Sequence, residues 1–194
     1  MSAAMASQVA GCSLEVAVHE AGHAVVAAYL RCPFTHVTIL PGVRGEGYVR
    51  FKSSGVREFA LSRKTDSFGE PTLHVRRRTA EEIKAELNRR YRNLALVSLA
   101  ARAAVDEVFI NNFFDEDVYE GDEASLKIVA TWLEIAPKDF EAWRALLLTE
   151  ARSIVELWPV FSAIIKIAKD LQIAKGKGRG LSSKHVRAVL RESM

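Results

Sequence analysis

Two histidines and a glutamate form the pattern H-E-x-x-H in a stretch that favours a helix. His19, Glu20 and His23 lie within VAVHEAGHAVVAAYL, residues 16–30. Side chains four residues apart share one face of a helix, so both imidazoles can reach a single Zn²⁺. Glu20 lies one position further round and can meet water bound to that metal. The pattern therefore predicts a hydrolytic zinc site with two histidine ligands and a carboxylate general base.

The helix that carries this motif should begin near Ser13, a residue type that favours N-caps. Proline restricts the residue before it, so Cys32-Pro33 should end the helix at about Arg31. Gly22 weakens a helix, and its place beside His23 indicates that another backbone packs closely there.

The composition fits one globular domain. With 194 residues, 49% of them hydrophobic, the chain can fill one core, and we expect a flexible N-terminus over residues 1–12 and a single domain over residues 13–194. The net charge of +3 is too small to indicate nucleic acid. No apolar run approaches the ~20 residues that span a bilayer. Cys12 and Cys32 lack a metal-ligand spacing, which favours reduced thiols in a cytoplasmic protein.

A small β-hairpin or sheet is expected directly after the motif helix. Residues 35–40, THVTIL, and 47–51, GYVRF, combine β-branched and aromatic residues, with turn residues between them. An exposed strand edge beside a zinc site could bind an extended peptide through main-chain hydrogen bonds. An ordinary structural sheet explains the pattern equally well, so both interpretations stay open. Residues 52–78 lose the pattern and should form a long loop or flap with little regular structure.

Helices account for most of the rest of the chain. Thr79 and Glu82 have the spacing of a capping box and should begin a helix that ends near Phe109. Its apolar second half, residues 94–105, should be buried against the motif helix, while Asp106 and Glu107 more readily pair with basic groups than surround a metal. Further helices are expected over residues 122–136, 138–158, 159–174 and after Ser182 or Ser183. The predicted fold class is therefore mainly α (α+β).

A zinc site needs a third protein ligand, and the helix over residues 122–136 offers candidates. Leu126, Val129 and Leu133 form its inward stripe. Asp122 lies one turn before Leu126 on the same side, whereas Glu123 falls on the outer face. Asp122 is therefore the best-placed carboxylate.

These segments, taken in order, resemble the peptidase domain of the FtsH family of ATP-dependent zinc metalloproteases. VHEAGHAVVA is similar to the family's metal-binding helix, HVTILPG with GEGYVRF to its next strands, and ARAAVDEVF to a stretch in which GRAAEE is usual. The tail, ARSIVELWPVFSAIIKIAKDL with LSSKHVRAVL, is similar to the closing helices, so the resemblance covers residues 14–190. It implies that His19 and His23 bind zinc, that Glu20 is the general base and that a later Asp is the third ligand.

The chain departs from the family's pattern at two points. An alignment on Gly121 without a gap places Ser125, a poor zinc ligand, where the family has its aspartate. We therefore match Asp122 to that aspartate and keep Glu123 as the second choice. No G-x-x-x-x-G-K-[ST] motif occurs in the sequence, so unfolded substrate would have to arrive unaided or from a separate ATPase.

The resulting prediction is a cytoplasmic zinc-dependent endopeptidase that hydrolyses peptides or unfolded protein segments. The alternative is a non-catalytic zinc-binding adaptor or regulator that keeps the peptidase fold and binds peptides or a partner protein. Nucleic-acid binding, resting on residues 76–78 and 89–92, is the weakest interpretation, and we expect no nucleic-acid partner and no membrane segment. A homo-oligomer is compatible with the sequence.

Overall fold

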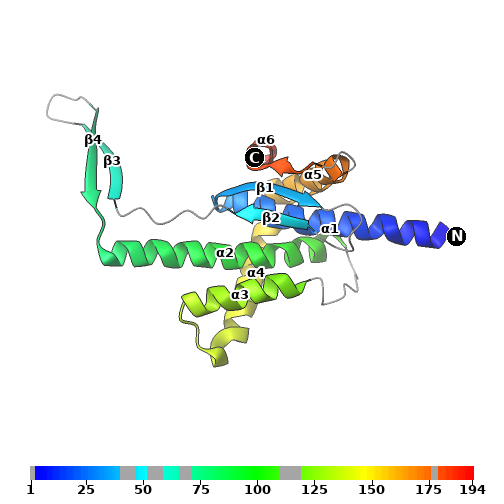
Figure 1. The fold of residues 1–194 in the computed structure, drawn as a ribbon, viewed down its shortest axis with the longest axis horizontal. Helices are drawn as coiled ribbons and strands as arrows, with labels where there is room; N and C mark the ends of the chain where they lie inside the picture. The colour runs from blue at the N-terminus through cyan, green and yellow to red at the C-terminus, as the bar shows by residue number, and fades with distance from the viewer. Residues whose placement is uncertain (1–2, 40–46, 52–58, 66–70, 110–118, 176–178) are drawn as a thin grey trace.

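A long helix pair forms the centre of the molecule (Figure 1). The computed structural model describes residues 3–39, 47–51, 59–65, 71–109, 119–175 and 179–194. This part of the chain contains six α-helices, one small three-stranded antiparallel sheet and a separate two-stranded hairpin. The predicted mainly α class is confirmed. None of its helices is both long and apolar enough to cross a membrane.

Helix α1, Ala3–Tyr29, carries the H-E-x-x-H motif in its second half. It begins well before Ser13, so the predicted start is wrong. The alanine-rich segment over residues 3–10 has high intrinsic helix propensity, a signal that apolar periodicity does not contain. Side chains before Leu14 lie outside the described part, and the flexibility of residues 1–12, like the single domain over residues 13–194, stays a prediction.

Helix α1 ends at a residue with left-handed backbone conformation, a position that is usually a glycine. Arg31 has φ 59°, and its N–H donates to the Ala28 carbonyl at 3.2 Å, while the Cys32 N–H donates to the Ala27 carbonyl at 2.8 Å. This pair of bonds is the Schellman arrangement, which satisfies the last carbonyls of a helix. The predicted end near Arg31 is confirmed.

Helix α2, Ala80–Val108, packs along α1. Thr79 and Glu82 form the predicted capping box, and the apolar second half of the helix is buried as expected. A Cβ added at Gly22 would lie 2.9 Å from the Ala100 carbonyl oxygen and 2.9 Å from the Ala104 Cβ. The two helices can approach this closely only because position 22 has no side chain, which confirms the close backbone contact predicted there.

The three-stranded sheet lies beside α1. Strand β1, Phe34–Ile39, pairs antiparallel with β2, Gly47–Phe51, and with the short β5, Leu181–Ser182. The predicted hairpin is confirmed, with Val37 opposite Val49. In the strand order β2-β1-β5, β2 forms one edge of the sheet within the described residues.

The segment over residues 52–78 contains more regular structure than predicted. Strands β3, Phe59–Thr65, and β4, Pro71–Arg77, pair antiparallel in continuous register, so the expectation of a flap with little regular structure is wrong for these residues. Residues 52–58 and 66–70 lie outside the described part. Main-chain hydrogen bonds can pair two strands even where apolar and polar residues do not alternate, and this alternation is the signal from which strands are predicted in a sequence. The hairpin extends beyond the N-terminal end of α2 (Figure 1).

Four further helices complete the core around α1 and α2. Helix α3, Glu120–Trp132, and the 3₁₀ turn η2, Pro137–Asp139, lead to α4, Phe140–Val155; α5, Trp158–Lys175, and α6, Ser183–Ser193, follow. Ser182 caps α6 as predicted, by accepting a hydrogen bond from the His185 N–H at 3.2 Å. Trp132 and Trp158 are 52% and 74% exposed, so neither is a core aromatic residue.

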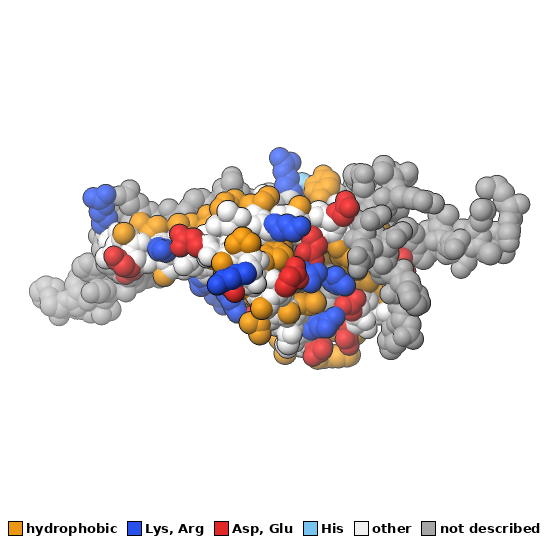
Figure 2. Space-filling view, turned by 90° about the horizontal axis from the view of Figure 1, so that it is seen from below, with side chains coloured by type: hydrophobic (Ala, Val, Ile, Leu, Met, Phe, Trp, Pro, Cys, Tyr) orange, Lys and Arg blue, Asp and Glu red, His pale blue; other side chains and the backbone are white. Residues whose placement is uncertain are grey.

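Ion pairs link α2, α3 and α4 on the face that these helices share. On this face acidic and basic side chains are interspersed among apolar ones (Figure 2). Arg152 pairs with Asp106 at 3.0 Å, which confirms the predicted role of that carboxylate as a partner of a basic group. Arg92 pairs with Glu150. Exposed pairs of this kind contribute ~0–1 kcal/mol each, so packing rather than charge holds these helices together.

Candidate metal centre

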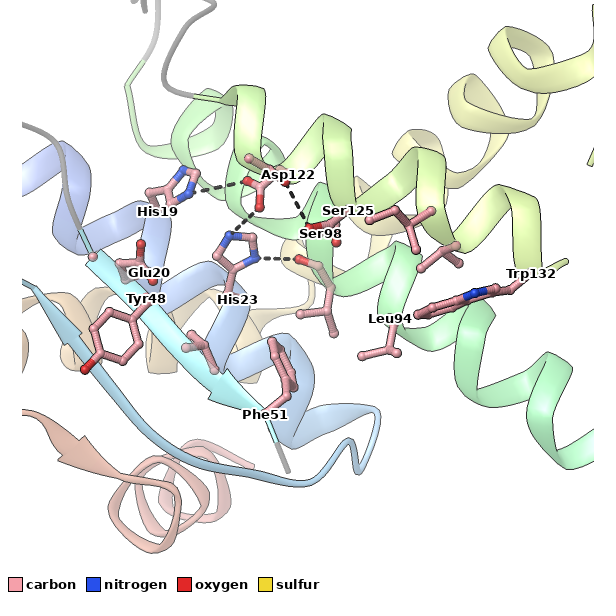
Figure 3. Close-up of a pocket in the computed structure, with 16 residues that line it drawn as sticks. His19, Glu20, His23, Tyr48, Phe51, Leu94, Ser98, Asp122, Ser125 and Trp132 are labelled. Atoms are coloured by element: carbon pink, nitrogen blue, oxygen red, sulfur yellow. Dashed lines mark hydrogen bonds and ion pairs between the residues drawn. The ribbon is translucent and has the colours of Figure 1, made fainter. Parts of the chain in front are cut away.

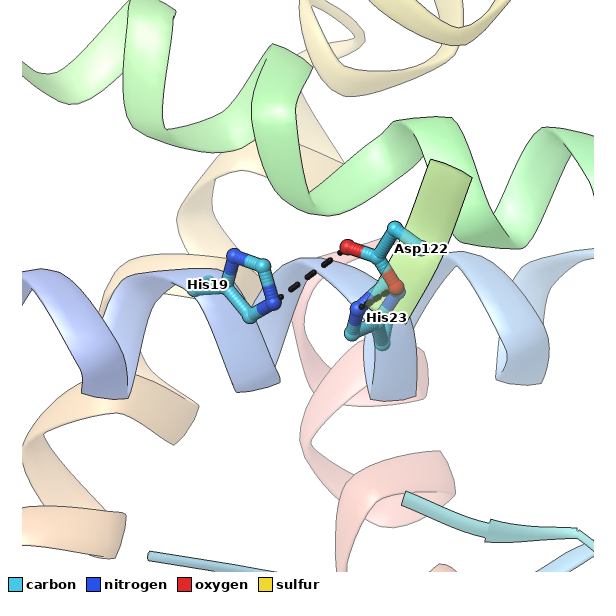
Figure 4. Close-up of side chains that lie close together, drawn as sticks. All are labelled: His19, His23 and Asp122. Atoms are coloured by element: carbon cyan, nitrogen blue, oxygen red, sulfur yellow. Dashed lines mark ion pairs between the residues drawn. The ribbon is translucent and has the colours of Figure 1, made fainter. Parts of the chain in front are cut away.

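Three side chains from two helices converge beside the centre of α1. His19 and His23 project from α1, and Asp122 projects from the first turn of α3 (Figure 4). Asp122 Oδ2 lies 3.4 Å from His19 Nε2, and Asp122 Oδ1 lies 3.1 Å from His23 Nε2. One potential ligand atom from each residue lies within 4.8 Å of the others. The three residues assigned to the metal from the sequence are therefore brought together.

The other two candidates for the third position lie in different surroundings. The Arg144 Nε donates to Glu123 Oε1 at 2.8 Å, so this carboxylate is held by α4 and not by the histidines. The Ser125 hydroxyl donates to the Gly121 carbonyl at 2.9 Å. Asp122 is placed by Leu126, which is fully buried one turn later and fixes the rotation of α3. Of the three candidates, Asp122 alone lies against both imidazoles.

The orientation of His23 is set by helix α2. Its Nδ1 lies 2.7 Å from the Val97 carbonyl oxygen, and since a carbonyl can only accept, Nδ1 carries the proton and donates. Nε2 is thereby directed at Asp122. A backbone carbonyl that fixes the tautomer of a metal-binding histidine in this way is a frequent feature of zinc sites. The sequence placed Val97 in a buried apolar segment but gave no sign of this contact.

Glu20 lies next to the triad formed by His19, His23 and Asp122 and is covered by strand β2. Its side chain is 4% exposed, and a Cβ added at Gly47 would lie 2.7 Å from Glu20 Oε1. The first residue of β2 must therefore be a glycine for the strand to lie so close to the carboxylate. Sequence analysis gave Gly47 no role, although a glycine within a strand is a known sign of close approach by another group.

Three buried polar atoms of the site lack a hydrogen-bond partner among the described residues. They are His19 Nδ1, Glu20 Oε2 and Asp122 Oδ2. Buried polar atoms are nearly always paired, so such a group indicates a ligand, an ion or water at the site. Two imidazole nitrogens and a carboxylate oxygen form a donor set that suits zinc, and three protein ligands are typical of zinc sites that keep one position open. The residues present therefore fit a zinc ion.

Without a metal, the pKa values of the two histidines shift in opposite directions. Burial and the repulsion of His23 lower the pKa of His19 to about 3. Burial also acts to lower the pKa of His23, but the Asp122 carboxylate, Glu20 and the Val97 carbonyl together raise it to about 9. At neutral pH the metal-free site thus holds a His23 imidazolium paired with Asp122. A metal ion must replace the Nε2 proton of His23. The affinity of the site for a metal ion should therefore fall as the pH is lowered.

The environment of Glu20 suits proton transfer near neutral pH. Burial, with a smaller contribution from Asp122, raises the pKa of Glu20 to about 7, although His23 opposes the shift. A general base is most effective when its pKa lies near the working pH. Glu20 therefore has the electrostatic character expected of an acid–base group.

Tyr119 completes the wall of the site beside His19. Its ring is nearly buried, lies 5.7 Å from the His19 ring and has the Arg102 guanidinium 5.4 Å above its face. This cation–π contact gives Arg102, which lies within the apolar segment of α2, an aromatic partner. Burial raises the pKa of Tyr119 to about 12, so the phenol stays neutral.

A cavity of about 520 Å³ opens from the candidate metal ligands. The histidines, Glu20 and Asp122 form its polar end (Figure 3). Its walls continue as apolar side chains from three elements: Tyr48, Val49 and Phe51 of β2, Leu94 and Val97 of α2, and Ile128, Val129 and Trp132 of α3. The cavity therefore has a polar end at His19, Glu20, His23 and Asp122 and an otherwise mainly apolar lining.

Comparison with known proteins adds no family assignment. No protein-family model matches the chain, and no curated protein is significantly similar to it.

Proposed function

We propose that this protein is a zinc-dependent endopeptidase that hydrolyses peptides or unfolded protein segments. The observation that carries the proposal is the convergence of His19, His23 and Asp122 beside the buried carboxylate of Glu20. The resemblance of residues 14–190 to the FtsH-family peptidase domain supports it. Cytoplasmic location, a homo-oligomeric state and a separate ATPase that delivers unfolded substrate belong to the same proposal.

The chemistry divides between the triad and Glu20. His19, His23 and Asp122 would hold the zinc ion, which when bound polarises the peptide carbonyl and acidifies water. Glu20 accepts a proton from the attacking water and then donates it to the nitrogen of the leaving amine as the C–N bond breaks. The Val97 carbonyl keeps His23 in the tautomer that offers Nε2 to the metal.

The surroundings of the site suit an extended peptide. Strand β2 is an edge strand among the described residues and starts at Gly47, against Glu20. A peptide segment can add to such an edge by main-chain hydrogen bonds, which places its carbonyl groups along the site without selecting a sequence. The apolar walls around Trp132 would then bind a large apolar side chain next to the cleaved bond.

The proposal is tested by hydrolysis of casein and of a peptide library with the zinc-loaded protein. The chain should bind one zinc ion, cleave unfolded substrates and lose activity when the metal is removed by chelation. Glu20→Gln should keep zinc and lose hydrolysis, whereas Glu15→Gln, the same change earlier on α1, should keep both. Unchanged hydrolysis in Glu20→Gln excludes this mechanism.

A non-catalytic adaptor or regulator is the second candidate. The close approach of strand β2 to Glu20 favours it. Although Glu20 lines the cavity, Gly47 lies against its carboxylate and only 4% of the residue is exposed, so strand β2 covers it on one side. A protein that kept the metal centre only to stabilise a peptide-binding groove would show these features. It would bind one zinc ion and retain peptides from the library, yet would turn over no unfolded substrate.

A further inference from the structure

A second cavity lies between the C-terminal end of α1 and helix α6. It has a volume of about 570 Å³. It shares no lining residue with the cavity of the metal centre. Four basic side chains line it: Arg31, Lys184, Arg187 and Arg191.

The spacing of the basic residues on α6 gives them a common face. Lys184, Arg187 and Arg191 are three and then four residues apart, so they form one stripe along the helix. The buried residues Val186 and Val189 lie on a different side. The stripe therefore faces the end of α1, where Arg31 adds a fourth positive charge from a separate element.

Within the described part of the chain, none of these four side chains forms a salt bridge; Arg191 interacts electrostatically with Glu192, whose carboxylate is paired with Lys166. The remaining charged groups of α6 are used on its contact with α5: Glu192 pairs with Lys166 at 2.8 Å, and His185 pairs with Asp170 at 2.7 Å. Elsewhere on the molecule, Arg144 and Arg152 each have a carboxylate partner. The cavity thus gathers four basic side chains that form no salt bridge within the described residues.

Several contacts hold the basic groups in place. The Arg187 guanidinium lies 5.9 Å from the ring centroid of the buried Phe34, and the Arg191 Nε donates to the Arg187 carbonyl at 3.2 Å. The backbone of Arg31 lies in the left-handed turn that ends α1. Ser183 adds a hydroxyl from the first turn of α6, where the helix dipole also favours an anion. Like charges held together in this way repel one another, and a bound anion would relieve that repulsion.

We propose that this cavity binds a small polyphosphate anion. Arginine side chains match phosphate oxygens with paired hydrogen bonds, and four positive charges suit a ligand that carries several negative ones. A hollow of this volume is in the range of small-molecule sites. A concave site with a buried floor at Leu190 suits a compact ligand better than the extended backbone of a nucleic acid or a membrane surface.

The test is calorimetric titration of the full chain with inorganic triphosphate at physiological salt. We expect saturable binding of one triphosphate per chain. Arg187→Gln and Lys184→Gln should each weaken it about tenfold, since each removes a charge-assisted hydrogen bond. Lys169→Gln, which removes the same charge from an exposed position on α5, should leave the affinity unchanged.

Four results would overturn the proposal. They are an absence of saturable binding, an equal loss of affinity in Lys169→Gln, a loss in His19→Ala but in neither α6 variant, and retention of the chain on duplex DNA or on anionic vesicles without binding of triphosphate. Because Arg187 packs on the core residue Phe34, its variant is compared with wild type by thermal unfolding. Lys184 is exposed, so Lys184→Gln tests the proposal even if Arg187→Gln is unstable. None of these measurements depends on peptidase activity.

Discussion

Gly47 of β2 lies directly against the carboxylate of Glu20: a Cβ at that position would be 2.7 Å from Glu20 Oε1. The edge strand proposed to receive a peptide therefore also limits the position of Glu20, the proposed general base. Under the proposed function, this one backbone position would link substrate binding to acid–base chemistry.

Gly47→Ala should consequently impair hydrolysis without removing the metal. The added methyl group must displace either β2 or the Glu20 side chain, and misplacing a catalytic group by about 1 Å can lower the rate on the order of 100-fold. We expect kcat to fall by about 10- to 100-fold with one zinc per chain, measured by peptide hydrolysis and metal analysis. Gly121→Ala is the matched control because a Cβ there meets nothing within 4 Å. Similar activity in the two variants would show that the contact at Gly47 is unimportant.

Metal content should separate the three candidates for the third ligand. Asp122→Ala removes the only one of these side chains that contacts both histidines, so zinc affinity should fall by at least ~100-fold. Glu123→Ala breaks a pair with Arg144, and Ser125→Ala removes a hydroxyl that is bonded to Gly121, so both should retain zinc. Competition with a chelator measures the affinities. Full zinc binding by Asp122→Ala, or its loss in Glu123→Ala at unchanged melting temperature, contradicts the assignment.

The metal-free protein should show a pH-dependent effect of Glu20 on stability. Burial raises the pKa of Glu20 from 4.5 to about 7, so the folded state binds this proton more tightly than the unfolded state. Its contribution to the free energy of unfolding is therefore present below pH 4.5 and is lost as the pH rises to about 7. Since one pKa unit corresponds to about 1.4 kcal/mol, the loss is at most ~3.5 kcal/mol.

Glu20→Gln cannot ionise, so it should gain stability relative to wild type as the pH is raised from 4.5 to 8. Urea unfolding of both chelator-treated proteins across this range measures the difference. Glu20 also raises the pKa of His23, so the comparison measures the coupled titration of Glu20 and His23 rather than that of Glu20 alone. A stability difference that is independent of pH would mean that burial does not raise the pKa of Glu20.

Trp132 should influence which peptides are cleaved. Its side chain lines the apolar part of the cavity, so Trp132→Ala should lower kcat/KM for peptides with a large apolar residue next to the cleaved bond by about tenfold. Peptides with a small residue there should change little. Trp158→Ala removes an equally large exposed ring away from the site and serves as the control. An equal loss for both classes of peptide would indicate damage to the fold rather than a binding pocket.

The site could be located from the sequence to the extent that its geometry is local. His19, Glu20 and His23 are spaced by one helix, and Asp122 followed from the face that it shares with Leu126. The contacts of Val97 with His23 and of Gly47 with Glu20 depend instead on how α2 and β2 pack against α1, which no short-range pattern encodes. Their residue types were suggestive only in retrospect.

The same distinction explains the fold. The capping box at Thr79, the stop at Pro33 and the glycine at position 22 are local signals, and the structure bears out each of them. The β3–β4 hairpin depends on main-chain pairing between segments with little apolar alternation, so the pattern missed it. The early start of α1 reflects alanine propensity over residues 3–10, which periodicity cannot detect.

The most direct test of the proposed function is peptide hydrolysis by zinc-loaded Glu20→Gln, with Glu15→Gln beside it. If Glu20 moves the proton, kcat falls by at least ~100-fold while zinc content stays at one per chain and Glu15→Gln stays active. Hydrolysis by Glu20→Gln at the wild-type rate, with zinc bound, would contradict the account.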